Sequence, residues 1–382
     1  MNYRETTTTA LILLATLALG RTAPGQQWLD PRCKALPFAK VTQLVELRDG
    51  KILTVDGTAT KTSSDDGKTW SAAKTIYDGP GPGIPTDALC HLMIRTKSGA
   101  LVMVYMDKST QDALVWDTAK NEAGKDGRLD VWCIRSLDEG DTWIDRQKVL
   151  DGYCGALIGM IQTLQGRIVL PVQTLFEHNR HAIIGVNSAD DGKTWQRGNI
   201  IDLGGRGDHD GAMEPTLAEL KNGRLLMLVR TNLDRFWEAY SDDGGRYWRE
   251  LRPSQIEASS SPGWMMRLAS GRLVLVWNRL YPEGKTASDM PAGWYRAPAG
   301  GQQAEVAASW YREEFSLAFS EDDAKTWTKP VVIARQPDGQ CSYPYVFERR
   351  PGELWVIGRF ANPCWFSLKE ADFVQQQTAA AK

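Results

Sequence analysis

The clearest pattern along the chain is a short apolar run that follows a turn ending in glycine. Runs of this length, bounded by turn residues, are typical of β-strands that are buried on both faces. No segment between the runs has a sustained helical periodicity, so we expect an essentially all-β protein. The six copies, each given with its turn, are Asp49–Val55, Ser98–Tyr105, Gln165–Val172, Asn222–Val229, Ser270–Trp277 and Pro351–Gly358.

An octapeptide with serine, aspartate and tryptophan at fixed positions alternates with these runs. Its aspartate can accept hydrogen bonds from nearby backbone N–H groups while a glycine two residues later takes a positive φ, which describes a tight turn between two strands. The tryptophan can cover the hairpin and bury a large apolar area. Five equivalent copies predict a structural role for these aspartates, because catalysis needs one site. The copies are Ser63–Trp70, Ser136–Trp143, Ser188–Trp195, Ser241–Trp248 and Ser320–Trp327, with Tyr247 replacing threonine and Ala324 replacing glycine.

Six apolar strands, five of them followed by the aspartate turn, indicate six four-stranded antiparallel units. Radial packing of such units closes the array and protects the strand edges that an open array would expose. We therefore expect one domain over residues 21–382, folded as a six-bladed β-propeller. The last unit lacks the turn, so a strand near Trp365–Phe373 is expected to complete the ring. The tail from Gln375 to Lys382 is expected to fray.

The first twenty residues have a different pattern. A polar start containing Arg4 is followed by an apolar run from Ala10 to Gly20, which is too short to span a bilayer and ends in small residues. This pattern is typical of a cleavable signal peptide over residues 1–20. We therefore expect a secreted or periplasmic protein without a membrane span.

Composition narrows the classes of partner and cofactor. A formal net charge of -2 offers no basic face to nucleic acid, and nothing indicates the oligomeric state. Six cysteines without a CxxC spacing, together with only four histidines, give no metal signature, so we expect neither a metal nor an organic cofactor. In an exported protein the cysteines could form one or two disulfides, and the alternative is buried free thiols.

Two units carry long insertions, over residues 107–129 and 280–310. The first is charged, and the second is rich in Pro, Gly and Ala and contains Trp294, Tyr295 and Arg296. Long loops on a rigid scaffold often determine specificity. The alternative for both insertions is a solvated excursion without such a role.

Three further segments match the pattern of one known family. A glutamate, Glu214, precedes a strand that ends at Arg230, Arg312 lies shortly before the fifth aspartate turn, and Cys341–Pro344 places Tyr343 ahead of the last apolar strand. With the aspartate turns, known as Asp boxes, these segments resemble the sialidase (neuraminidase) superfamily over nearly the whole mature chain. The resemblance implies a retaining exo-glycoside hydrolase with Tyr343 as the nucleophile and Glu214 as its base.

The implied chemistry follows from the substrate. A sialic acid carries its carboxylate on the anomeric carbon, so an anionic nucleophile would approach against charge repulsion. A tyrosine arrives neutral and is activated by a nearby glutamate, which sets sialidases apart from glycosidases with two catalytic carboxylates. Arginine offers planar, two-donor binding of a carboxylate, and the resemblance assigns this role to Arg230 and Arg312. Arg230 also ends an apolar strand, where an unpaired charge is costly.

The chain departs from the family pattern at the third cation. Where the family has Phe-Arg-Ile-Pro, the sequence runs from Phe38 to Val41 with Lys40 at the arginine position. Lysine keeps the charge but loses the two-donor fork. This departure leaves room for another acidic sugar or a neutral one.

Two residues compete for the role of general acid. Asp87 lies in the loop where the family places an aspartate, and His91 follows four residues later with an imidazole that can carry a proton near neutral pH. Asp208, His209 and Asp210 form another polar cluster, which could line the cleft; we interpret it as a solvated turn.

Three functions fit these residues. The first is an exported sialidase-like hydrolase that acts on a glycan or glycoconjugate. The second is a glycosidase for a different acidic or neutral sugar. The third is a non-catalytic carbohydrate-binding propeller, because a fold does not by itself imply chemistry. The tyrosine mechanism requires the hydroxyl of Tyr343 to lie within hydrogen-bond reach of Glu214.

Overall fold

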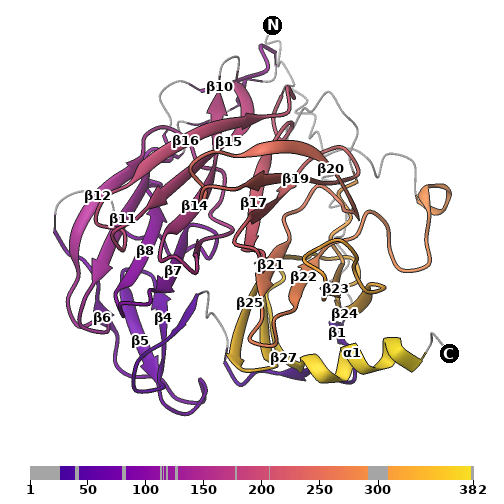
Figure 1. The fold of residues 1–382 in the computed structure, drawn as a ribbon, viewed down its shortest axis with the longest axis horizontal. Coiled ribbons are helices and arrows are strands. Elements are labelled where there is room, and N and C mark those ends of the chain that lie inside the picture. The colour runs from indigo at the N-terminus through magenta and orange to yellow at the C-terminus, as the bar shows by residue number, and fades with distance from the viewer. Residues whose placement is uncertain are drawn as a thin grey trace, which may run out of the picture.

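Six antiparallel sheets are arranged in a ring around a central axis (Figure 1). The computed structural model describes residues 26–379, apart from 39–42, 80–82, 112–113, 115, 118, 125–127, 177–178, 206 and 291–308. The expected signal peptide, Lys40 and the Trp294–Arg296 segment lie outside the described residues. The prediction of an all-β chain folded as a six-bladed propeller is confirmed.

The first four blades follow the chain in order. Each has four strands, which are named here from the innermost to the outermost. Blade 1 holds β3 (Leu44–Glu46), β4 (Ile52–Asp56), β5 (Ala59–Ser63) and β6 (Lys74–Thr75). Blade 2 holds β7 (His91–Arg95), β8 (Leu101–Met106), β11 (Val131–Ser136) and β12 (Ile144–Leu150). Blade 3 holds β13 (Ile161–Gln162), β14 (Ile168–Phe176), β15 (Arg180–Ser188) and β16 (Gln196–Asp202). Blade 4 holds β17 (Met213–Glu219), β18 (Leu225–Arg230), β19 (Arg235–Ser241) and β20 (Arg249–Glu257).

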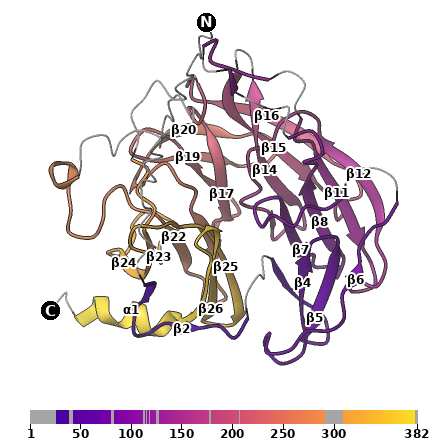
Figure 2. The ribbon, with the colours of Figure 1, turned by 180° about the vertical axis from the view of Figure 1, so that it is seen from behind.

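The last two blades also take strands from the N-terminal segment. Blade 5 holds β21 (Trp264–Arg267), β22 (Leu273–Trp277), β23 (Glu314–Ser320) and β24 (Val331–Arg335), with β1 (Trp28–Leu29) added at its outer edge. Blade 6 holds β25 (Cys341–Arg350), β26 (Glu353–Ala361) and β27 (Cys364–Lys369), and its fourth strand is β2 (Lys34–Ala35). In Figure 2 the indigo β2 runs beside the yellow strands of this blade.

Strands from both ends of the described chain therefore meet in blade 6 and close the ring. The expected closing strand near Trp365–Phe373 is present as β27, but it ends at Lys369. The helix α1 (Glu370–Ala379) follows, so the expectation of a frayed tail is wrong for residues 375–379. Acidic side chains in the first turn of α1 favour a helix start, and Phe373 is buried in the apolar core.

The six apolar runs form the second strand of each blade, counted from the axis. Every residue of β8 and of β18 is buried. These strands have hydrogen-bonded neighbours on both sides and pack against adjacent blades through both faces. Their position explains why the runs are continuously apolar instead of alternating.

The innermost strands surround a channel with a cavity volume of about 490 Å³. Residues of β3, β7, β13, β17, β21 and β25 all line it, and Trp264 and Tyr345 are its largest aromatic side chains. Their rings pack edge to face, 4.8 Å apart. The channel marks the propeller axis and gives the molecule two distinct ends.

The Asp boxes connect the third and fourth strands of blades 1 to 5, and their hydrogen bonds confirm the structural role predicted for them. In the third copy, Asp190 accepts hydrogen bonds from the Thr194 backbone (2.8 Å) and hydroxyl (2.6 Å), and Ser188 donates to it at 2.8 Å. Gly192 has a φ of 79° and donates its N–H to Ser188. The aspartates therefore hold the turns.

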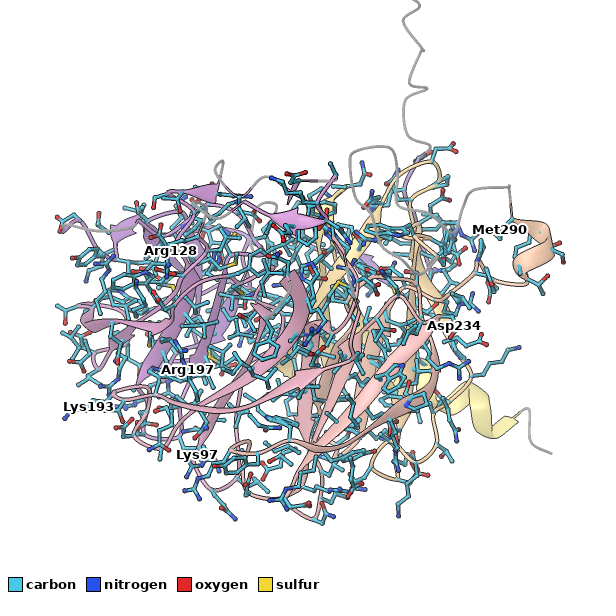
Figure 3. All side chains as sticks on the ribbon, turned by 90° about the horizontal axis from the view of Figure 1, so that it is seen from above. Lys97, Arg128, Lys193, Arg197, Asp234 and Met290 are labelled. Atoms are coloured by element: carbon cyan, nitrogen blue, oxygen red, sulfur yellow. The ribbon has the colours of Figure 1, made fainter. Side chains whose placement is uncertain are left out.

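The Asp boxes and the turns between first and second strands lie at one end of the propeller. Arg349, in blade 6, joins them by pairing with Asp66 and donating to the carbonyl of Gly50. Lys193 and Lys97 lie on this side of the molecule in Figure 3, and Arg128 and Met290 lie on the opposite side. The first insertion forms the hairpin β9 (Trp116–Asp117) with β10 (Glu122–Ala123), and the second contains the short helix η3 (Ala287–Asp289).

All six cysteines are buried free thiols, so the alternative to disulfides holds. Cys341 and Cys364 come nearest to each other, with their Sγ atoms 3.6 Å apart. Among the described residues, no helix is long and apolar enough to cross a membrane. In the same part of the chain, no group of three or more His, Cys, Asp or Glu side chains is arranged to hold a metal ion.

Candidate active site

The candidate site lies at the end of the channel opposite the Asp boxes. Glu214 on β17 and Tyr343 on β25 each come just before the residues of their strand that line the channel. Arg230 is the last residue of β18, the strand that runs antiparallel to β17, so it reaches the same end. Residues far apart in the sequence therefore meet, because each blade places the start of its first strand and the end of its second strand at this end of the channel.

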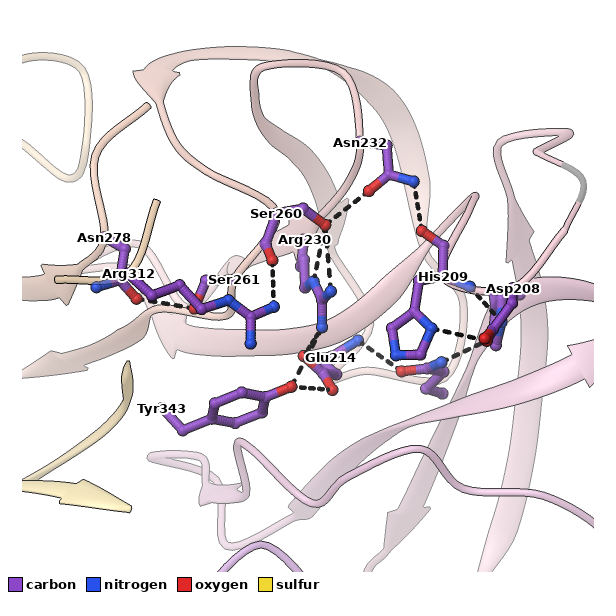
Figure 4. Close-up of polar contacts among 12 residues, drawn as sticks. Asp208, His209, Glu214, Arg230, Asn232, Ser260, Ser261, Asn278, Arg312 and Tyr343 are labelled. Atoms are coloured by element: carbon purple, nitrogen blue, oxygen red, sulfur yellow. Dashed lines mark hydrogen bonds and ion pairs between the residues drawn. The ribbon is translucent and has the colours of Figure 1, made fainter. Parts of the chain in front are cut away.

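Tyr343, Glu214 and Arg230 form one hydrogen-bonded group (Figure 4). The hydroxyl of Tyr343 donates to Glu214 Oε1 at 2.8 Å. Arg230 Nη1 forms an ion pair with Glu214 Oε2 and lies 3.3 Å from Tyr343 Oη. The three side chains are almost completely buried. The distance required by the tyrosine mechanism is thus present.

The charges of this group follow from their neighbours. Burial alone would raise the pKa of Glu214, but the charge of Arg230 and the hydrogen bonds from Arg230 and Tyr343 lower it overall. Burial, followed by the negative charge of Glu214, raises the pKa of Tyr343 to about 12. Glu214 is therefore an ionised acceptor and Tyr343 a neutral donor, which are the states that a base and its nucleophile need before reaction.

Arg312 lies beside this group and is held by the backbone that connects blade 4 to blade 5. Its Nη2 donates to the carbonyl of Ser260 at 2.6 Å, while Nε is buried without a hydrogen-bond partner. Burial, together with repulsion from Arg230, lowers the pKa of Arg312 to about 10. A carboxylate bound here would give Nε a partner and restore charge balance.

Ser260 and Trp310 complete the support of the two arginines, and no motif or spacing in the sequence marks either residue as part of a site. The hydroxyl of Ser260 lies 3.2 Å from both Nε and Nη2 of Arg230 and donates to Asn232 at 2.6 Å. The Trp310 ring faces the guanidinium groups of Arg312 at 4.6 Å and Arg230 at 5.6 Å. The half-buried Trp310 thus forms an apolar wall beside two cations.

Arg359 is a third buried arginine, which the sequence analysis missed. It lies near the end of β26, donates to the carbonyl of Tyr343 at 3.3 Å and to that of Ala88 at 3.4 Å, and has an Nη2 without a hydrogen-bond partner. Burial lowers its pKa to about 10. A signal existed: Arg359 follows its turn glycine, Gly352, by the same seven residues that separate Gly223 from Arg230.

The two residues expected to compete as general acid lie in unlike surroundings. Asp87 is exposed, accepts the Leu89 N–H at 2.9 Å and pairs with Lys108 at 3.1 Å. Although partial desolvation opposes the change, these contacts lower the pKa of Asp87. His91 is buried in β7, and burial followed by the charge of Arg359 lowers its pKa to about 4.

The cluster at residues 208–210 is built into the site, so its interpretation as a solvated turn is wrong. Asp210 is buried, and His209 is half-buried with its Nδ1 2.7 Å from Asp208 Oδ1. The backbone N–H of His209 lies 3.2 Å from Nε2 of His181, and its carbonyl accepts a hydrogen bond from Asn232. Bonds to two blades therefore fix the cluster in place.

A family model described as a BNR repeat-like domain matches residues 92–356, well over half of the chain. The chain belongs to this BNR repeat-like family. Membership agrees with the five Asp boxes and the six blades, and it confirms the resemblance to the sialidase-like propeller superfamily. No curated protein sequence matches the chain.

Solved structures with the same fold include members of this superfamily. A Dyadobacter fermentans protein of unknown function has a TM-score of 0.59 and 16% identity, covering 91% of this chain and 98% of its own. A Hadza microbial sialidase has a TM-score of 0.58 and 15% identity, with coverage of 87% and 66%. The Ruminococcus gnavus intramolecular trans-sialidase has a TM-score of 0.53 and 15% identity, with coverage of 86% and 94%. At such identities the likeness establishes the fold alone.

Proposed function

We propose that this BNR repeat-like protein is an exported, retaining exo-glycoside hydrolase that removes a terminal sialic acid, or a related acidic sugar, from glycans. The observation that carries the proposal is the 2.8 Å hydrogen bond from the Tyr343 hydroxyl to the buried Glu214 carboxylate. The sialidases among the proteins of similar fold add support. Export is proposed from the N-terminal sequence pattern over residues 1–20.

In the first half of the reaction, Tyr343 Oη attacks the anomeric carbon while its proton passes to Glu214. A tyrosine is a weak nucleophile until its proton leaves, and the adjacent carboxylate removes it as the new bond forms. Arg230 keeps Glu214 ionised before the transfer and lies within reach of the phenolic oxygen as negative charge develops there. In the second half, water releases the sugar and Tyr343 recovers its proton from Glu214.

Arg312 and Arg230 would bind the carboxylate of the sugar, and Trp310 would pack against an apolar face of the ring. Arg312 has an N–H without a partner, whereas the donors of Arg230 are already engaged with Glu214, Tyr343 and Ser260. We therefore assign the larger share of carboxylate binding to Arg312. Two cations near the anomeric carbon favour an acidic sugar over a neutral one.

The test is hydrolysis of a fluorogenic sialoside by the purified protein, followed by NMR of the first sugar released. Release of sialic acid with retained anomeric configuration is the expected result. Activity on a uronide but not on the sialoside would support a glycosidase for another acidic sugar, the alternative favoured by Lys40 at the usual arginine position. Binding of both sugars without any release would overturn the hydrolase proposal and leave a carbohydrate-binding propeller.

A further inference from the structure

The proposed hydrolysis needs a group that gives a proton to the departing oxygen. Asp87 is poorly suited, because the Leu89 N–H and Lys108 stabilise its ionised form. His91 is buried within β7 and its pKa is low. Both sequence-based candidates are therefore in the wrong state to donate a proton at neutral pH.

His209 is bound into the same framework as the two arginines. Its carbonyl accepts a hydrogen bond from Asn232, Asn232 accepts one from the Ser260 hydroxyl, and Ser260 contacts Arg230 through its side chain. The Ser260 carbonyl in turn holds Arg312. Any displacement of His209 would thus disturb the groups that position the sugar.

The imidazole of His209 lies at the edge of the site. Its ring centroid is 5.7 Å from that of Trp310, the ring that faces both arginines. In Figure 4 it lies between Asp208 and the Glu214–Arg230 pair. A half-buried imidazole with a carboxylate on Nδ1 is held in one orientation, which fixes the direction in which Nε2 points.

We propose that His209, oriented by Asp208, is the general acid and base of this site, an inference that rests on the proposed hydrolase function. In the first step, the bond from the anomeric carbon to the leaving oxygen breaks, and that oxygen takes the proton from Nε2 of the imidazolium. The Tyr343 proton goes to Glu214 in the same step. In the second step, neutral His209 takes a proton from the attacking water, whose oxygen bonds to the anomeric carbon. The bond from the anomeric carbon to Tyr343 Oη breaks as this new bond forms, and the phenolate regains its proton from Glu214.

Three charged side chains lie near His209. Asp208 contacts its Nδ1, and Arg230 and Arg312 lie against the Trp310 ring that packs beside it. His181 of β15 stays neutral, because burial and the neighbouring His209 lower its pKa to about 3. Activity on a substrate that needs proton donation should therefore fall on the alkaline side of the pH profile as His209 loses its proton.

The experiment compares two sialosides with different leaving groups. Sialyllactose releases lactose, whose departing alkoxide oxygen needs a proton, whereas the 4-nitrophenyl sialoside releases the stable 4-nitrophenolate anion without one. We expect His209→Asn, which keeps a donor for Asp208, to lose about 10²–10⁴-fold in kcat/KM on sialyllactose and far less on the 4-nitrophenyl sialoside. The variant should also lose the alkaline limb of the profile.

Equal losses on both substrates with an unchanged pH profile would assign His209 a structural role and overturn the inference. The same holds if Asp87→Asn, and not His209→Asn, shows the dependence on the leaving group. If the substituted protein does not fold, the wild-type protein supplies the test: an alkaline limb for sialyllactose that is absent for the nitrophenyl substrate is expected, and identical profiles would contradict it. A wild-type protein inactive on both sialosides and on uronides would refute the proposed function itself.

Asp208 is a positioning residue in this scheme. Asp208→Asn should lower kcat on sialyllactose much more than on the 4-nitrophenyl sialoside, because the carboxylate that holds Nδ1 and orients the imidazole is gone. Equal losses of kcat on both substrates would show that Asp208 acts only on the fold of the loop.

Discussion

Tyr343 and Glu214 are joined by a 2.8 Å hydrogen bond while both hold left-handed backbone conformations, with φ values of 56° and 38°. Such conformations are strained for residues other than glycine and persist only where the surroundings impose them. Arg359 binds the carbonyl of Tyr343, and Gln173 accepts a hydrogen bond from the N–H of Glu214 at 3.3 Å. The protein therefore holds the two side chains together before substrate binds.

This relationship predicts that Tyr343→Phe inactivates the protein without unfolding it. The variant keeps the aromatic ring but removes the only atom that bonds to Glu214 and the sugar. We expect kcat on a fluorogenic sialoside to fall by at least about 10²-fold, with a thermal midpoint near that of the wild type. Full activity in this variant would exclude Tyr343 as the nucleophile.

Glu214→Gln should differ from Tyr343→Phe by damaging stability as well as activity. Loss of the Glu214 carboxylate leaves Arg230 as a buried charge without its ionic partner, which typically lowers the free energy of unfolding by about 3–5 kcal/mol. Chemical denaturation of the two variants measures the contrast. Equal free energies of unfolding would mean that the buried ion pair contributes little to the fold.

Arg312→Lys tests whether the site recognises an acidic sugar. Lysine cannot reproduce the planar donors of Arg312 or the bond to the Ser260 carbonyl in the same geometry. We expect KM for a sialoside to rise by about 10–100-fold, the effect of losing roughly 1.4–3 kcal/mol of charge-assisted hydrogen bonding. Arg272→Lys, which alters a surface ion pair with Glu321 at the opposite end of the propeller, is the matched control. An unchanged KM in Arg312→Lys would argue against carboxylate binding by this residue.

The repeats predicted the fold well because the same local sequence patterns recur from blade to blade. Apolar runs buried on both faces and Asp boxes both leave strong signals in the sequence. The outer strand β2 left no such signal, since it has only two residues and is defined by its pairing with β27 near the C-terminus. Short pairings between distant segments have no local pattern to predict them.

Glu214, Arg312 and Tyr343 were predicted through the resemblance to the family, whereas the residue pattern alone marks the candidate site only where charge interrupts an apolar run. Arg230 stood out for this reason. Arg359 follows its turn glycine at the same spacing as Arg230, so a comparison of the two spacings would have identified it as well. Ser260 acts through its backbone carbonyl and a small hydroxyl, which no spacing marks. His209 was visible as a polar residue, but its burial comes from contacts with blades 3 and 4 that the sequence does not encode locally.

The Asp boxes predict a loss of stability in acid. The Thr69 N–H, with the hydroxyls of Thr69 and Ser63, lowers the pKa of Asp65 to about 2. A carboxyl whose pKa is lower in the folded than in the unfolded state stabilises the fold above its unfolded pKa of about 3.9, and this stabilisation is lost as pH falls toward 2. The pKa is lowered in the other four box aspartates too, namely Asp138, Asp190, Asp243 and Asp322.

Unfolding midpoints measured between pH 5 and pH 2, a range set by these carboxyl pKa values, check this expectation. The wild type should lose stability throughout the lower part of the range. Asp65→Asn should be less stable near neutral pH and show a shallower fall, because one of the five titrating turns is gone. Parallel curves for the two proteins would mean that this carboxylate does not couple its protonation to folding.

Ala324 offers the opposite test, a substitution that should stabilise the protein. It occupies the glycine position of the fifth Asp box with a φ of 65°, whereas the glycines of the first four boxes have φ values of 82°, 92°, 79° and 86°. A left-handed conformation costs an L-residue about 1–2 kcal/mol, partly offset by the greater freedom of glycine in the unfolded chain. Ala324→Gly is therefore expected to raise the free energy of unfolding by ~0.5–1 kcal/mol, with activity unchanged because the box lies at the end of the propeller opposite the site.

The matched control is Gly192→Ala in the third box. It introduces the same strained conformation and places a Cβ 2.8 Å from Cγ1 of Val102, in the neighbouring blade. Contact at this distance requires the blades to shift, so we expect a loss of about 1–3 kcal/mol. Opposite signs in the two variants, measured by chemical denaturation, are the expected outcome. A destabilised Ala324→Gly would mean that the fifth box has adapted to alanine through contacts that outweigh its backbone strain.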